Sequence, residues 1–185
     1  DVLWVETISA PEEYKAAAEA AALAGMPWCG TMSFDTAGRT MMGLLPSHFE
    51  RVFDVEPQAP LAIGANCGVG ASDILVSLLE MAGSSIALVS KGNCGVPQFV
   101  GTEVVYSGTP ELMGKYAALA VDAGARIVGG CCGTSPEHLA VMRAAIDTHE
   151  RGEPPTVERI VGEVGPLTNS VPSIAEPAER RTAIA

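Results

Sequence analysis

The chain has 185 residues, of which 48% are hydrophobic, and this is enough for one globular core. Its 22 acidic and 11 basic side chains give a net charge of -11, which argues against nucleic acid and anionic membrane surfaces as partners, because both favour clustered Lys and Arg. No apolar run approaches the ~20 residues of a membrane span. The acidic balance is typical of cytoplasmic proteins, and we predict a cytoplasmic location.

The first half of the chain alternates short apolar runs with helix-forming ones. A strand is predicted at 3–5, and Ser9-Ala10-Pro11-Glu12 then has the pattern of a capping box with Pro in the first turn. The alanine-rich helix that follows ends at Gly25. The next predicted elements are a strand at 28–34, a loop at 35–45, a short helix at 47–55, a strand at 61–65 and a helix at 72–81.

The second half repeats this alternation and then changes in composition. Its predicted elements are a strand at 86–89, a long loop at 91–108, a helix at 109–124, a strand at 126–128 and a helix at 135–149. Five of the 13 prolines fall after residue 150, where only a short helix at 157–161 is predicted. We therefore predict one domain over 1–150 and a Pro-containing extension over 151–185 that is partly flexible.

Short strands that alternate with capped helices indicate βα units on a parallel sheet. Five such strands are too few for a closed eight-stranded barrel, which needs about 250 residues. Two interpretations remain at this point, namely an open doubly wound sheet or the C-terminal part of a larger barrel.

Three of the five cysteines stand where predicted strands end. Cys67 follows the strand at 61–65, and the adjacent pair Cys131 and Cys132 follows the strand at 126–128. Strand ends of a parallel α/β fold share one rim, so these thiols can converge although they are distant in the sequence. Three thiolates suit zinc and leave the fourth tetrahedral position open, as in catalytic sites. A strained disulfide or redox switch, or buried inert thiols, are the alternatives.

Other candidate ligands have simpler explanations. Cys94 lies in a strand-end loop, where a passive thiol is favoured over a fourth ligand that would close the site. Cys29 begins a strand and is predicted to lie in the core. His138 follows the cysteine pair on a capped helix, and we expect it to lie near the surface or behind the ligands rather than to bind the metal.

Five segments of the chain carry a resemblance to a known family. They are LWVETIS (3–9), TMSFDTAGRTMMG (31–43), GANCGVG (64–70), KGNCGVPQ (91–98) and GGCCGTSPEH (129–138). Together they closely resemble the homocysteine S-methyltransferase family, from residue 1 to about 165, and within it the bacterial betaine–homocysteine type. Cys94 departs from the small residue that the family leads us to expect there.

The resemblance implies strands four to eight of a zinc-dependent (βα)8 TIM barrel, with the N-terminal strands missing from the chain. It implies that Cys67, Cys131 and Cys132 bind zinc and that Glu6 holds the amino group of homocysteine, although an interior carboxylate satisfied by Arg or backbone amides is the plainer interpretation of Glu6. Asn66 is predicted to bind substrate or to orient Cys67. Exposed strand edges should leave the isolated chain unstable, so we expect about a hundred further N-terminal residues or a completing chain.

The function implied is transfer of a methyl group from betaine to the homocysteine thiol, giving methionine. Small molecules are the expected substrates, and a homo-oligomer or a completing N-terminal segment the expected protein partner. S-methylmethionine or a methylated cobalamin or folate are alternative donors, and a non-catalytic zinc-binding or redox-sensing protein is the alternative of another class. A betaine donor favours aromatic contacts, for which Trp4, Phe34 and Tyr106 are candidates beside a default role in packing.

Overall fold

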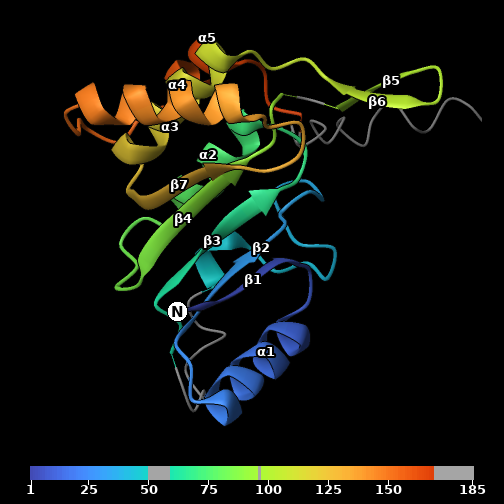
Figure 1. Ribbon diagram of the computed structural model, residues 1–185, viewed down its shortest axis with the longest axis vertical. Coiled ribbons are helices and arrows are strands. Elements are labelled where there is room, and N and C mark those ends of the chain that lie inside the picture. Colours follow the sequence, from blue (N-terminus) through green and yellow to red (C-terminus); the bar gives the residue numbers. More distant parts are fainter. Residues whose placement is uncertain (50–58, 96, 169–185) are drawn as a thin grey trace, which may run out of the picture.

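The computed structural model describes residues 1–49, 59–95 and 97–168. Five parallel strands form one sheet (Figure 1), in which their spatial order follows their order in the chain. The strands are β1 (Leu3–Ile8), β2 (Trp28–Met32), β3 (Ala62–Cys67), β4 (Ala87–Gly92) and β7 (Ala125–Gly130). Each of the four strand pairs is parallel, as the alternation of strands and helices predicts.

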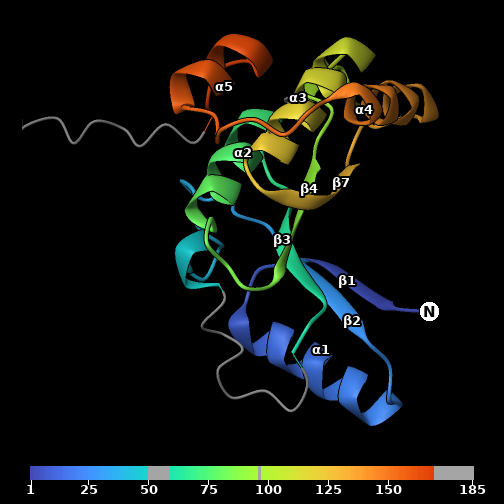
Figure 2. The same cartoon turned by 90° about the vertical axis from the view of Figure 1, so that its left-hand side faces the viewer.

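The crossover helices identify the kind of α/β sheet. They are α1 (Pro11–Ala24), α2 (Ala71–Glu80) and α3 (Pro110–Asp122), and α4 (Pro136–Thr148) follows the last strand. Since right-handed crossovers between strands in chain order all lie on one side, the helices cover a single face of the sheet (Figure 2). A doubly wound sheet would reverse its strand order part-way, and this sheet does not. The fold is part of a barrel wall, in which the outer edges of β1 and β7 are unpaired among the described residues.

The main core lies between the sheet and its helices. The ring of Tyr14 on α1 packs 4.9 Å from that of Trp28 and 5.0 Å from that of Phe49, measured between ring centroids. A second, smaller apolar cluster joins Cys29, Ala62 and Val89 from three neighbouring strands. The prediction that Cys29 lies in the core is confirmed, since its side chain is buried.

Three local predictions for the first 60 residues meet different outcomes. The capping box at Ser9 is wrong, because Ala10 is the N-cap of α1 and no side chain caps that end. Gly25 does end the helix, with a left-handed φ of 63°. Of the short helix predicted at 47–55, the structure shows a single 3-10 turn over Pro46–His48, and residues 50–58 lie outside the described residues.

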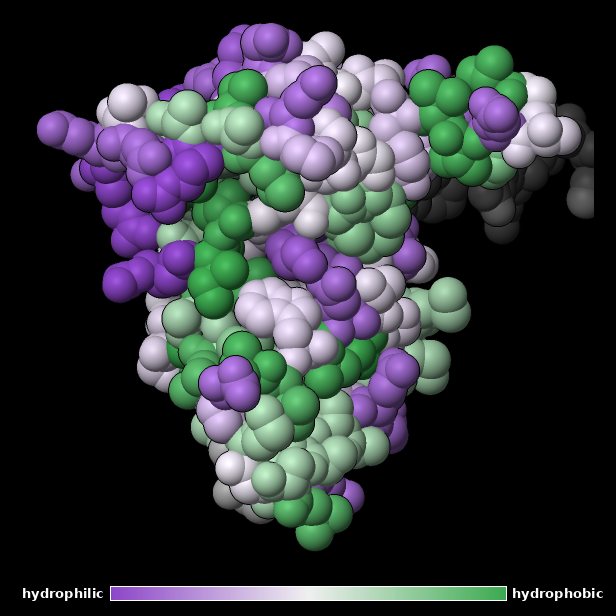
Figure 3. Space-filling view, in the orientation of Figure 1, coloured by the Kyte–Doolittle hydropathy of each residue, from purple (hydrophilic) through white to green (hydrophobic). Residues whose placement is uncertain are grey.

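The predicted long loop at 91–108 contains an antiparallel hairpin of β5 (Pro97–Val100) and β6 (Glu103–Tyr106). The hairpin projects from the body of the molecule (Figure 1), and apolar side chains form much of its surface (Figure 3). Its exposed apolar residues are Phe99, Val100, Val104 and Val105. Strands of four residues are too short to give a clear periodic signal, so the sequence pattern did not indicate them.

The segment after residue 150 is only partly irregular. The helix predicted at 157–161 is present as α5 (Val157–Val164), and its Ile160 is fully buried in the main core. Thr168 donates through its hydroxyl and its backbone N–H to Asp73 of α2. A loosely held end is predicted from Pro166 onward; Thr168 is hydrogen-bonded, and residues 169–185 lie outside the described residues. Within the described ranges, no helix has the length and apolarity needed to cross a membrane.

Candidate metal centre

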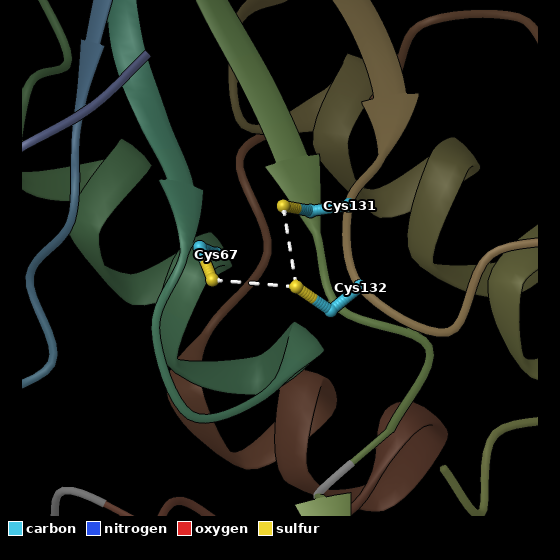
Figure 4. Close-up of side chains that lie close together, drawn as sticks. All are labelled: Cys67, Cys131 and Cys132. Carbon is cyan, nitrogen blue, oxygen red and sulfur yellow. Dashed lines mark hydrogen bonds between the residues drawn. The ribbon is translucent and has the colours of Figure 1, made fainter. Parts of the chain in front are cut away.

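Three cysteine thiols meet at the C-terminal rim of the sheet. Cys67 is the last residue of β3, while Cys131 and Cys132 directly follow β7 (Figure 4). The Sγ atom of Cys132 lies 3.7 Å from that of Cys67 and 3.9 Å from that of Cys131. All three ligand atoms lie within 4.8 Å of one another. The convergence expected from the strand ends is therefore present.

The spacing of these sulfur atoms fits a metal ion. Zinc–thiolate bonds of about 2.3 Å in a tetrahedron place neighbouring sulfur atoms roughly 3.8 Å apart. The two measured separations, 3.7 and 3.9 Å, bracket that value, and both are much longer than the ~2.05 Å of a disulfide. Thiolates are also the ligand type that binds zinc well. The three cysteines can thus hold one metal ion.

The backbone turns sharply at both ligand-bearing strand ends. Cys67 has a φ of 59°, an uncommon conformation for a residue with a side chain, and Gly68 continues it at 73°. After the cysteine pair, Gly133 has a φ of 77°, and a Cβ atom there would lie 2.4 Å from the ring of Tyr106. These turns direct the thiols inward over the rim, and they require glycine at Gly133 for both conformation and space.

The thiols influence each other's protonation. Burial, together with the neighbouring Cys131 and Cys132, raises the pKa of Cys67 to about 12. In the absence of a cation, the thiol of Cys67 therefore stays protonated near neutral pH, because burial and nearby thiols disfavour its charged form. Burial and a contact with Cys132 also raise the pKa of Tyr106 at the base of the hairpin.

Asn66 connects the rim to the end of β1. Its side chain is fully buried, its Oδ1 accepts from the N–H of Thr7 at 2.8 Å and from the hydroxyl of Thr31 at 2.6 Å, and its Nδ2 donates to the Thr7 hydroxyl at 2.7 Å. The same Nδ2 lies 3.8 Å from the Sγ of Cys131. Asn66 was predicted to orient Cys67, whereas the structure places its amide against Cys131. A contact between Asn66 and substrate stays a prediction.

Glu6 lies on β1 at the same end of the sheet. Its Oε2 forms an ion pair with the Nζ of Lys91 from β4, and it also accepts from Nε1 of Trp4 at 3.4 Å. The same Lys91 Nζ lies 5.6 Å from the centroid of the Trp4 ring, within reach of a cation–π contact. An exposed carboxylate held next to an indole ring is suited to bind a cationic group.

A family model described as homocysteine S-methyltransferase matches residues 1–146, which is more than half of the chain and includes the cysteines of the candidate metal centre. The chain belongs to the homocysteine S-methyltransferase family.

Two solved structures share this fold. They are crystal structures of the homocysteine methyltransferase MmuM from Escherichia coli in an apo form and a metallated form, each 23% identical to this chain with a TM-score of 0.62. Both comparisons cover 78% of this chain, but only 49% and 44% of the respective MmuM chains. The chain thus spans about half the length of these structures, in agreement with a partial barrel.

The other residues considered as ligand or donor-binding candidates have packing or helix-capping contacts in the structure. Cys94 is buried, and its Sγ lies 3.3 Å from the carbonyl oxygen of Gly108, so it is outside the three-cysteine cluster. His138 completes a capping box with Ser135 at the start of α4, as expected for a residue that is not a ligand. Phe34 is buried in the main core and packs on Phe49, which is the packing role that the sequence made its default.

One residue at this rim was not singled out from the sequence. Asn93 directly follows β4, and its side chain is 2% exposed. It forms hydrogen bonds to Gly68, which follows Cys67, and to the backbone of Cys132. An Asn between a strand end and a Cys was the available signal, but a sequence does not show which backbone groups such an amide reaches.

Proposed function

We propose that this protein transfers a methyl group from betaine to the thiol of homocysteine, giving methionine, with zinc held by Cys67, Cys131 and Cys132. The observation that carries the proposal is the meeting of three thiols within 4.8 Å of one another in a chain of the homocysteine S-methyltransferase family. Zinc bound by these residues would lower the pKa of the homocysteine thiol from its ordinary value of about 8.5, so that the sulfur reacts as a thiolate near neutral pH.

The chain's own residues would supply orientation. Glu6 offers a carboxylate to the ammonium group of homocysteine, in the place where Lys91 now pairs with it. The negative charge of the three cysteinates would offset that of a bound zinc ion, so that the homocysteine sulfur would keep its nucleophilicity. The sulfur then attacks a methyl carbon in line with its C–N bond. The C–S bond forms, the C–N bond breaks, and its electron pair leaves on dimethylglycine, while the thiol proton goes to solvent. Correct positioning of this kind is worth about 7–11 kcal/mol.

Betaine is favoured among the donors by the resemblance of the motifs and by Trp4. This side chain is 37% exposed, although it lies within a strand, and its ring already has a cation within 5.6 Å. A quaternary ammonium group binds preferentially over such a ring. The Tyr106 ring next to Cys132 is a second aromatic group at the same rim.

In the part of the chain that the structure describes, the outer edges of β1 and β7 are unpaired, and this supports a further part of the proposal. We propose that about a hundred residues forming three more βα units, from this polypeptide or from another chain, close the barrel over residues 1–150. The segment 151–185 would then be an extension packed outside the barrel, with α5 as its anchor. A cytoplasmic location is part of the same proposal.

The experiment is a panel of methyl donors scored by methionine formation with the zinc-loaded protein. Betaine, S-methylmethionine, methylcobalamin and methyltetrahydrofolate are supplied with homocysteine. We expect methionine with betaine and none after Cys132→Ser. Methionine with another donor alone would reject betaine but retain the reaction. No methionine with any donor, together with a reversible Cys131–Cys132 disulfide, would favour the redox-sensing alternative instead.

A further inference from the structure

Asn93 lies between the two sources of metal ligands. It follows β4, which is the strand between β3 and β7 in the sheet. Cys67 is the last residue of β3, and the cysteine pair directly follows β7. A side chain at this position is therefore able to contact both ligand loops at once, and Asn93 is almost completely buried there.

Both ends of the Asn93 amide are used in this way. Its Nδ2 donates to the carbonyl oxygen of Gly68 at 2.9 Å, one residue after the ligand Cys67. Its Oδ1 accepts from the backbone N–H of Cys132, itself a ligand, at 3.1 Å. One planar group thus fixes the distance between two backbone segments that each carry a sulfur atom of the cluster.

The same short segment also holds the cysteine pair through its backbone. The N–H of Cys94 donates to the carbonyl oxygen of Cys132 at 2.9 Å, and the N–H of Cys131 donates to the carbonyl oxygen of Gly92 at 2.8 Å. The N–H and the carbonyl of Cys132 are both held as a result. On the other side, the left-handed backbone at Cys67 is a costly conformation for a residue with a side chain, and it persists only where surrounding contacts maintain it.

We propose that Asn93 is a positioning residue of the metal centre, which holds the Cys67 loop and Cys132 at the separation that a tetrahedral ion requires. The inference rests on the proposed metal site. Residues that hydrogen-bond behind metal ligands typically contribute 10–100-fold to metal affinity. Asn suits this role because it is short and presents one donor and one acceptor, whereas leucine has a similar shape and presents neither.

The test compares metal binding by the full-length wild-type protein, Asn93→Leu and Ser77→Ala. Ser77 is a matched control, because it is a buried polar residue of α2 whose hydroxyl donates to the Asp73 carbonyl oxygen. Cobalt(II) binding is followed through thiolate-to-cobalt absorption, and zinc affinity is measured by competition with a chelator. We expect Asn93→Leu to bind zinc 10–100-fold more weakly and to show altered cobalt bands, while Ser77→Ala stays within about twofold of wild type.

The possible results separate this inference from the proposed function. The inference is overturned if Asn93→Leu binds zinc with wild-type affinity and shows wild-type cobalt bands. A variant that loses thermal stability but binds metal unchanged would also overturn it, because Asn93 would then have a purely structural role. If wild type itself shows no thiolate-to-cobalt bands, the proposed metal site fails, and this inference fails with it. Should Asn93→Leu not fold, Asn93→Ala removes the same two hydrogen bonds without adding carbon atoms, and the same criteria apply.

Discussion

Glu6, which we propose to hold the ammonium group of homocysteine, is already fixed at the rim by neighbouring side chains. Its carboxylate is paired with Lys91 and also accepts from Trp4, so it is held in place although it is partly exposed. Exposed ion pairs of this kind contribute little to stability, with a typical value of about 0–1 kcal/mol. A role in binding therefore accounts better for a carboxylate at this position than a role in folding.

Replacement of Glu6 by Gln should raise the KM for homocysteine. Loss of one charge-assisted hydrogen bond costs about 1.5–3 kcal/mol, which corresponds to roughly a 10–100-fold increase. Metal content should not change, because Glu6 is outside the three-cysteine cluster. Steady-state kinetics over a range of homocysteine concentrations measure the effect, and Glu12→Gln on the exposed first turn of α1 is the control. An unchanged KM would remove Glu6 from the substrate site.

Among the elements, α5 is held to the body by a buried carboxylate at the end of α3. The side chain of Asp122 is 1% exposed and accepts from His149 Nε2 and the Gly152 N–H, both at 2.7 Å, and from Arg159 Nη1 at 3.3 Å. Arg151 of the same connection donates to two carbonyl oxygens near β7. These contacts fix the polypeptide that leads from α4 to α5.

The pKa of Asp122 gives this connection a pH dependence. Burial alone would raise its pKa, but the hydrogen bonds from Gly152 and His149, with the charges of His149 and Arg159, hold it below its ordinary value. The stabilisation is therefore complete above the unfolded-state pKa of about 3.9 and is lost as the pH falls through the lower folded-state value.

Asp122→Asn should lower the free energy of unfolding by about 1.5–3 kcal/mol at pH 7. The difference from wild type should shrink as the pH falls below about 4, because wild type then loses the same charge. Urea unfolding at pH 7 and at a pH below about 4 measures this difference in the free energy of unfolding. Asp147→Asn is the matched control, since Asp147 pairs with Arg143 on the exposed face of α4, and it should change stability by less than about 0.5 kcal/mol. Equal effects of the two substitutions would contradict the prediction.

The elements also show which features a sequence can and cannot reveal. The three-cysteine cluster follows from a general rule, because the carboxyl ends of parallel strands meet at one rim. Glu6 was found only through the family resemblance, since a lone carboxylate in a strand has no distinctive pattern. The contacts of Asn93 and Asp122 were not predictable, because each depends on how irregular segments place backbone groups that are distant in the sequence.

At the scale of the whole molecule, the described residues form a sheet with helices on one face, and both outer edges of this sheet are unpaired among them. On β7, Ile127 is 37% exposed, although it lies within an apolar strand. Unpaired edges with apolar side chains favour association with other chains. This accords with the proposal that further strands close the barrel.

The isolated 185-residue chain should therefore self-associate in solution. We expect Ile127→Lys to reduce this association, because a charge on an edge strand disfavours pairing. Leu23→Lys is the control, since Leu23 is an exposed apolar residue near the end of α1, away from both edges. Analytical ultracentrifugation measures the oligomeric state. A monodisperse 19.1 kDa monomer with full activity would show that no further strands are needed.

The cysteines that form the cluster come from strands with another strand between them, and the last two of them follow β7, the final strand of the sheet. A nascent polypeptide interrupted before that strand presents only one of the three sulfur atoms and has no centre in which to capture an ion. With the metal site proposed above, uptake of the ion would come at the end of assembly, and the fraction of molecules that carry metal would record how many have completed their sheet.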